Sequence, residues 1–455
     1  MNQTFDFVFE LLPAFIWLVI ILAIGFGVRK KHIENPLYRF YMPNLLMKLF
    51  FGLAFASYYY FGIEGDTVAY YQSGEALTNL LFESPSAYFS ELFSENDSTQ
   101  IYRIYSVNTG FPKGWIYKEP EGFFIAKILS IFNLVTFKSF FATTFLIAFL
   151  TANATWKLFL FISKMKLTQD RFLAFALLLI PSVNFWCTGI SKDSFIYISI
   201  CYLTVYAFRT LAGDRLKLRD YVFIGLYIYL IISVRSFIFY ILLIPFALAW
   251  TSRLIKKIGA NDFTLMATRT LLLIGGISLI TLNLVSKSEE EILESNTFLN
   301  EASITQKDFA SNDTYGDNRY SIGEIEFTFL GLVQVAPAAI FVGAFRPILT
   351  EALEPSLILN GLESILLLFA LLRFFSKGAL RKYRFIRTNE FLYFCLIFVF
   401  LLSFITGLTS GLFGVLVRLR APLLPFLTLL LLVDYSSTFK PKESQKNEGE
   451  SAKLA

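Results

Sequence analysis

The chain has 455 residues, of which 55% are hydrophobic and only 16% charged, with a formal net charge of +5 and a positive mean hydropathy. Soluble domains average about 25% charged residues, so this composition excludes a soluble globular protein. Apolar windows near the roughly 20 residues that cross a bilayer recur along the whole chain, and we predict an all-α polytopic transmembrane bundle of about 11 spans.

The first predicted span covers residues 11–28, which lack the basic leader and small-residue exit of a cleaved signal peptide. The loop 29–39 carries four basic residues against one acid, which marks it as cytoplasmic and places the amino terminus outside. A second span is predicted at 45–61. The external loop 62–137 follows, and its residues 121–135 show a helical apolar stripe that favours a helix lying along the outer interface.

The middle of the chain alternates apolar runs with short basic turns. Spans are predicted at 138–162, 172–187 and 194–208, with basic residues 164–171 on the inside. The apolar run 221–250 is too long for one ordinary span, so we expect two short spans with an external turn at Arg235.

A second external loop is predicted at 286–355, after a span at 269–285. Its first part, 286–326, holds ten acids and three bases. Counting spans by the positive-inside rule then requires 327–355 to be re-entrant or to lie on the outer surface, broken at Pro337 and Pro347. The last spans are predicted at 356–375, 390–406 and 421–433. Residues 1–433 would form a single transmembrane domain, and 434–455 a disordered cytoplasmic tail.

Cysteine and histidine usage argues against metal chemistry. Cys187, Cys201 and Cys395 lie in or beside apolar stretches at no metal-like spacing, and the single histidine, His32, sits in a basic loop. We therefore predict no metal site and no cofactor. The acidic stretch 311–319, SNDTYGDNR, has oxygen ligands that a divalent cation could use, but a hydrated acidic loop is the simpler interpretation.

The predicted topology gathers the membrane-edge charges on the outer face. Ionisable groups at membrane depth cost roughly 2.5 to 3.5 kcal/mol each on insertion scales, and they mark functional sites by default. The basic groups outnumber the local acids, and this surplus suits a phosphate or pyrophosphate anion, which an arginine can bind through a bidentate contact. The alternatives are snorkelling side chains, a helix cap at Lys192 and Asp193, and a hydrated loop start at Glu64. The charged residues concerned are Glu64, Asp66, Lys192, Asp193, Arg235, Arg346, Glu351, Arg418 and Arg420.

Three short patches resemble known membrane proteins. The E-x-D of Glu64 to Asp66, set among aromatic residues, resembles the first external loop of the GT-C superfamily of integral membrane glycosyltransferases. PSVNFWCTGISKDSF (181–195) is similar to a P-s-x-x-x-W-s-s-x-x-x-K-[DE] hairpin of bacterial polysaccharide-assembly proteins. VRLRAPLLPFLTLLLL (417–432) resembles their closing R-x-R-x-P-x-x-P span.

The resemblance implies a polyprenyl-phosphate-linked sugar donor, a glycan acceptor and no soluble nucleotide-sugar domain. Asp66, with Glu64 beside it, would act as the general base on the acceptor hydroxyl. The donor phosphate would be bound by the cluster of Lys192, Asp193, Arg235, Arg346, Arg418 and Arg420. In this chain the acidic loop follows the second span, whereas the GT-C pattern places it after the first.

The functional hypothesis is a glycosyltransferase or polysaccharide polymerase of the cell envelope, working at the outer face of a bacterial inner membrane. Its partners would be the lipid-linked donor, the acceptor and membrane lipid, with no nucleic acid. Two alternatives stay open: a transporter or flippase of lipid-linked glycans, and a non-catalytic subunit of an envelope complex.

Overall fold

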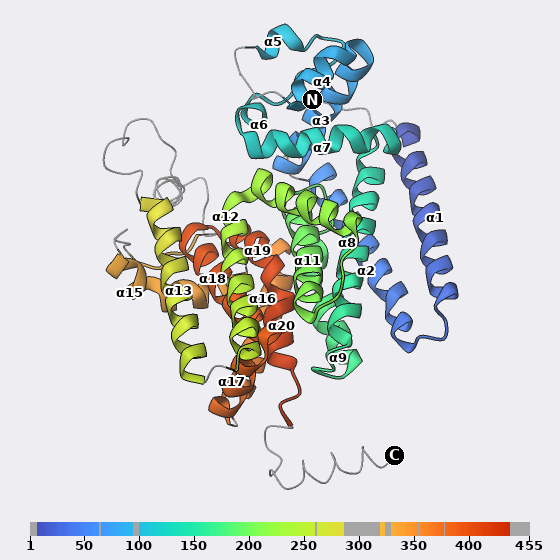
Figure 1. Cartoon of the computed structure of the whole chain (residues 1–455). Helices are drawn as coiled ribbons and strands as arrows, with labels where there is room; N and C mark the ends of the chain where they lie inside the picture. Colours follow the sequence, from blue (N-terminus) through green and yellow to red (C-terminus); the bar gives the residue numbers. More distant parts are fainter. Residues whose placement is uncertain are drawn as a thin grey trace. The chain divides into compact units, whose positions relative to one another are not determined.

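The structure is a computed structural model that describes residues 7–62, 65–93, 100–259, 262–285, 319–323, 329–352, 355–376 and 378–436. Over these residues the regular structure is helical, apart from one isolated β-bridge between Arg319 and Leu412 (Figure 1). Within the same ranges, eight helical segments are long and apolar enough to cross a membrane. The all-helical, multi-span prediction is confirmed, whereas the number near eleven is not.

The chain divides into two compact units, a division that the prediction of one domain over residues 1–433 did not contain. Unit 1 comprises Met1–Phe161, Leu177–Ile241 and Val417–Leu424, and unit 2 comprises Ile162–Ala176, Leu242–Leu416 and Pro425–Ala455. Five helices, α8, α9, α12, α19 and α20, begin in one unit and end in the other. The predicted tail 434–455 lies outside the described residues from position 437 onward.

Unit 1 holds the amino-terminal helices. They are α1 (Phe7–Lys31), η1 (Pro36–Phe40), α2 (Tyr41–Phe61), α3 (Asp66–Glu83), α4 (Pro85–Phe93), α5 (Ile101–Ile104), α6 (Gly114–Lys118), α7 (Pro120–Thr136), α8 (Phe140–Ser163), α10 (Pro181–Trp186), α11 (Lys192–Ala212), the first part of α12 (Leu218–Lys257) and η3 (Ala421–Leu423). The segment predicted as external loop 62–137 is thus largely helical, and its interfacial stretch forms the continuous helix α7.

Close packing of α3 against α7 organises the upper part of unit 1 in Figure 1. A side chain at Gly74 would place its Cβ 2.9 Å from the Leu129 Cβ and 3.1 Å from the Ala126 carbonyl oxygen, so only glycine allows this approach. Next to it, the Thr78 hydroxyl donates to the Ser130 carbonyl oxygen at 3.2 Å. This contact fixes where the amino-terminal ends of α3 and α7 lie.

Unit 2 holds most of the remaining helices. They are most of α9 (Asp170–Leu178), the second part of α12, α13 (Asp262–Val285), α15 (Phe329–Phe345), α16 (Pro355–Ser376), α17 (Ala379–Thr388), α18 (Glu390–Thr409), the first half of α19 (Phe413–Arg420), whose second half belongs to unit 1, and nearly all of α20 (Leu424–Leu432). Helices α15 and α18 touch through glycines, because a Cβ at Gly343 would lie 2.0 Å from the Ser403 carbonyl oxygen and one at Gly407 would lie 1.9 Å from the Ala339 carbonyl oxygen.

Proline and backbone geometry explain where the predicted spans were right and wrong. The span expected at 172–187 is instead two short helices, because Pro181 starts α10 and cannot continue α9. Helix α15 runs through Pro337 and ends before Pro347, so the predicted break at Pro337 is wrong. The predicted interruption of 221–250 is confirmed: Arg235 has φ −157° and ψ 88° within the 40-residue α12.

Candidate functional site

Seven charged side chains of unit 1 form two sets of ion pairs, which are joined by the neighbouring residues Lys192 and Asp193 and are here together called the charge cluster. Its members come from the start of α3, the start of α7, the start of α11, the break in α12 and the end of α19. They are Asp66, Glu119, Glu121, Lys192, Asp193, Arg235 and Arg418.

Asp193 is the buried centre of the cluster. One carboxylate oxygen lies 3.1 Å from Arg235 Nη1, and the other lies 3.6 Å from Arg418 Nε. Only 2% of the Asp193 side chain is exposed, against 14% for Arg235 and 22% for Arg418. A carboxylate this deeply buried is stable only with paired cations, so Asp193 holds both arginines in place.

The start of α11 explains how Asp193 and Lys192 reach the cluster. Ser191 is the N-cap, and its hydroxyl accepts the Ser194 backbone N–H, so the capping role that the sequence left open for Lys192 and Asp193 belongs to Ser191. The two residues that follow the cap are therefore free to point into the cluster. At α12, the non-helical backbone of Arg235 brings its guanidinium to Asp193.

Lys192 binds two carboxylates that flank Pro120, the first residue of α7. Its ammonium contacts Glu119 Oε1, and Glu121 Oε2 lies 3.5 Å away. The Lys192 side chain is 9% exposed, while both glutamates are nearly half exposed. Burial raises the pKa of Glu121, and the positive charges of Lys192 and Arg235 offset only part of this effect. Lys192 therefore holds one end of α7 against the start of α11.

Asp66 lies at the accessible side of the cluster. It is the first residue of α3, its side chain is 45% exposed, and Arg418 Nη1 lies 3.9 Å from its carboxylate. The same guanidinium lies 6.0 Å from the ring centre of Trp186. Burial, followed by the negative charges of Asp66 and Glu119, raises the pKa of the Tyr70 hydroxyl, which keeps it a hydrogen-bond donor.

The structure brings together five of the eight site residues predicted from sequence: Asp66, Lys192, Asp193, Arg235 and Arg418. Arg420 also belongs to unit 1 and is completely buried. Arg346 belongs to unit 2, where Glu351 accepts hydrogen bonds from its Nε at 2.9 and 3.0 Å. Glu64 and residues 311–318 of the acidic stretch lie outside the described residues.

Sequence reasoning missed Glu119 and Glu121. Both had been placed in the external segment, Glu121 at the start of the predicted interfacial helix, and neither was named as a site residue, although the motif E-P-E at a helix start could have indicated two carboxylates on the first turn. With them the cluster contains four carboxylates and three cations, so it has no surplus of positive charge. Across the described ranges, no group of three or more His, Cys, Asp or Glu side chains is arranged to hold a metal ion.

A cavity of about 470 Å³ lies on another face of α3 within unit 1. It combines aromatic side chains with hydrogen-bond donors and hydrogen-bond acceptors. Burial raises the pKa of Glu75 in this cavity, against the opposing charge of Lys138. On α3 the lining begins at Val68, two residues after Asp66. The lining residues are Phe9, Glu10, Tyr60, Val68, Tyr71, Gln72, Glu75, Phe137, Lys138 and Phe140.

No protein-family model, curated protein or solved structure matches this chain.

Proposed function

We propose that this chain is a membrane glycosyltransferase or polysaccharide polymerase that takes a sugar or glycan from a polyprenyl-phosphate-linked donor. The charge cluster would be the site, at the outer face of a bacterial inner membrane with the amino terminus outside and the carboxyl terminus in the cytoplasm. The single observation that carries the proposal is the convergence of Asp66 with Lys192, Arg235 and Arg418, which come from four separate elements.

The proposed roles follow from burial. Asp66 is the half-exposed carboxylate beside a fixed arginine, so it is suited to accept a proton from an acceptor hydroxyl that reaches the cluster. Arg235 and Arg418 are held by the buried Asp193, and an arginine with a fixed guanidinium can hold a phosphate by two points. Lys192 would add a third positive charge to stabilise the phosphate that leaves.

The cavity beside α3 supports a glycan as the acceptor. Sugar hydroxyls both donate and accept hydrogen bonds, and the cavity offers acceptors on Glu10 and Glu75, donors on Lys138, and both on Gln72. Aromatic side chains such as Tyr60 supply the apolar surface that small-molecule pockets use. A site for a simple ion would be lined by charges of one sign, whereas this cavity is lined by the carboxylates of Glu10 and Glu75 and by the ammonium of Lys138.

Transfer can be tested with the purified full-length chain in vesicles that contain polyprenyl-phosphate-linked hexoses and N-acetylhexosamines carrying a radioactive label. A transferase releases polyprenyl phosphate or pyrophosphate and moves the label to an added glycan acceptor. The variant D66N should abolish release, whereas E34Q, the matched loss of an exposed carboxylate in the loop after α1, should leave release unchanged. Equal release by D66N and the unaltered protein would refute the role of Asp66.

A transporter or flippase of lipid-linked glycans is the second candidate, and the charge balance favours it. Every cation of the cluster is already paired with a carboxylate, as in a gate that opens by exchanging ion pairs. In the same vesicles, movement of labelled lipid between leaflets with no bond broken would support transport and reject transfer. A vesicle preparation with neither activity would favour the third possibility, a non-catalytic subunit of an envelope complex.

A further inference from the structure

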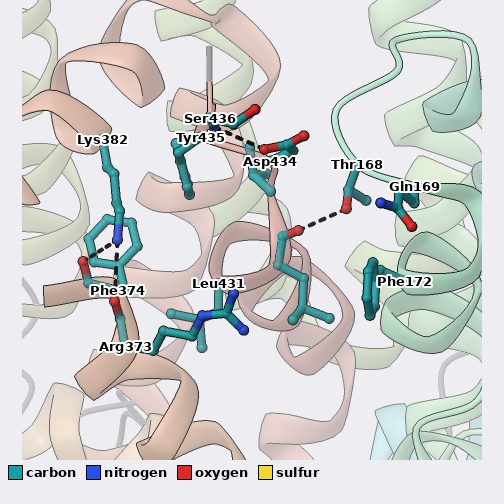
Figure 2. A pocket seen from close by; sticks show the side chains of 12 residues that line it. Thr168, Gln169, Phe172, Arg373, Phe374, Lys382, Leu431, Asp434, Tyr435 and Ser436 are labelled. Atoms are coloured by element: carbon teal, nitrogen blue, oxygen red, sulfur yellow. Dashed lines mark hydrogen bonds between the residues drawn. The ribbon is translucent and has the colours of Figure 1, made fainter. Parts of the chain in front are cut away.

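Unit 2 contains a cavity of about 410 Å³ that the proposed function does not use (Figure 2). It lies where the end of α16, the helix α17, the start of α9 and the segment after α20 meet. Figure 2 shows Lys382 and Arg373 on one side of the cavity and Thr168, Gln169 and Phe172 on the other, with the Arg373 side chain extending toward the middle.

Two cations share this cavity. The buried Lys382 ammonium donates to the carbonyl oxygens of Arg373, at 3.3 Å, and Phe374, at 2.7 Å, which satisfies the carboxyl-terminal end of α16. A lysine has three donors, so one is left. The Arg373 guanidinium makes no hydrogen bond or ion pair with any residue in the described part of the chain. Burial lowers the pKa of Lys382, and the nearby positive charge of Arg373 lowers it further. A bound anion would relieve the repulsion between these two cations.

One carboxylate also lines the cavity and must be counted. Asp434 accepts a hydrogen bond from the Ser436 backbone N–H at 2.9 Å, and this bond lowers its pKa, so it is ionised at neutral pH. Two cations and one anion leave the lining with a charge of +1. Hydrogen-bonding groups complete it: the Thr168 hydroxyl donates to the Leu432 carbonyl oxygen and keeps its lone pairs, while the Gln169 amide keeps its N–H donors.

The surroundings point to membrane lipid as the source of an anion. Helix α17, ALRKYRFIRT, is a short amphipathic helix with exposed arginines at 381 and 384. Beside the cavity, Phe375 is 62% exposed and Phe172 is 42% exposed, on helices that are otherwise apolar. Basic pockets with apolar rims at helix ends bind phospholipid headgroups, because the phosphate meets cations while the acyl chains stay on apolar surface.

We propose that this cavity binds the headgroup of an anionic glycerophospholipid. Its phosphate lies between Arg373 and the remaining donor of Lys382. The headgroup hydroxyls hydrogen-bond to Thr168, Gln169 and the Asp434 carboxylate, and the acyl chains follow the exposed Phe172 and Phe375. This lipid site belongs to unit 2 and is independent of the transfer or transport activity assigned to the charge cluster.

The test uses the full chain, purified in detergent and titrated with phosphatidylglycerol, phosphatidylethanolamine, phosphatidylcholine or inorganic phosphate. Native mass spectrometry measures each dissociation constant, and thermal unfolding measures the stabilisation. Phosphatidylglycerol should bind about tenfold more tightly than phosphatidylcholine. R373Q should remove about that tenfold preference. R384Q, which removes one exposed charge of α17 outside the cavity lining, should change binding less than twofold.

Several outcomes would overturn the proposal. Equal losses in R373Q and R384Q would mean diffuse surface attraction rather than a site. Equal binding of the three phospholipids would remove the requirement for an anion, and equal stabilisation by millimolar inorganic phosphate would remove the lipid. R373K guards against a folding defect: it keeps the charge but not the forked contact, so it should unfold like the unaltered protein and lose about threefold in affinity.

Discussion

Replacing Asp193 by asparagine should destabilise the protein much more than the same change at Asp66. Asp193 lies 3.1 Å from Arg235 and 3.6 Å from Arg418. With an effective dielectric constant of about 20, each contact contributes about 5 kcal/mol of gross attraction. Burying the carboxylate opposes that attraction, and removal of one partner from a buried pair typically lowers the free energy of unfolding by about 3 to 5 kcal/mol.

The contrasting pair at Asp66 is exposed and long. Its carboxylate is 45% exposed and lies 3.9 Å from Arg418, so water screens it and D66N should lower the free energy of unfolding by less than about 1 kcal/mol. A second control is D214N. Asp214 lies 3.2 Å from Arg209 Nε, as close as Asp193 lies to Arg235, but its side chain is 54% exposed. D214N should also cost less than about 1 kcal/mol.

The assay is denaturant-induced unfolding of the three variants in lipid bicelles, followed by intrinsic fluorescence. The expected order is a large loss for D193N and small losses for D66N and D214N. Similar losses for D193N and D214N would mean that burial does not set the strength of the pair, and the reasoning would fail. The double variant D193N/R418Q should recover part of the loss, because it removes one of the cations left unpaired.

Three further predictions concern other parts of the chain. Lys48 is fully buried, and its ammonium, 5.4 Å from the ring centre of Tyr197, has no hydrogen-bond partner within the described ranges. Because a buried charge without a partner destabilises the folded state, K48M should raise the thermal unfolding temperature. The raised pKa of Glu121 means that the folded state binds the Glu121 proton more tightly than the unfolded state, so the free energy of unfolding falls as pH rises from about 4.5 through the folded pKa. E121Q lacks this proton, so its unfolding temperature should gain on that of the unaltered protein across the same pH range. G343A should destabilise unit 2 by about 1 to 3 kcal/mol in the same denaturant assay, because its Cβ would collide with the Ser403 carbonyl oxygen; an unchanged midpoint would contradict the glycine contact.

Sequence reasoning succeeded where one local property decides the outcome. Apolar length identified the class of protein, and the out-of-place Arg235 identified the break in α12. It failed where the outcome depends on packing between segments. Pro337 lies within a continuous helix that is held against α18 through glycines, which a local rule for proline does not capture.

The candidate site shows the same division. Asp66, Lys192, Asp193, Arg235 and Arg418 were found because a charge in an apolar or membrane-edge segment is conspicuous. Glu119 and Glu121 were missed because charges in a polar external segment are ordinary, and only the folded structure brings the start of α7 to Lys192 at the start of α11. The predicted surplus of positive charge depended on that omission.

The charge balance of the cluster has a consequence for the proposed transfer reaction. A donor phosphate must displace carboxylates from the cations, and the half-exposed Asp66, Glu119 and Glu121 can move into water, whereas Asp193 cannot.

In the proposed reaction Arg235 and Arg418 would therefore stay fixed on Asp193. Lys192 would exchange its glutamates for phosphate oxygens, and Arg418 would exchange Asp66 for them. Release from Arg418 would leave the half-exposed Asp66 carboxylate without its ion-pair partner and able to turn toward an acceptor hydroxyl. In the proposed reaction the donor itself would free the base, so an acceptor hydroxyl would meet an unpaired carboxylate only in a site already loaded for transfer.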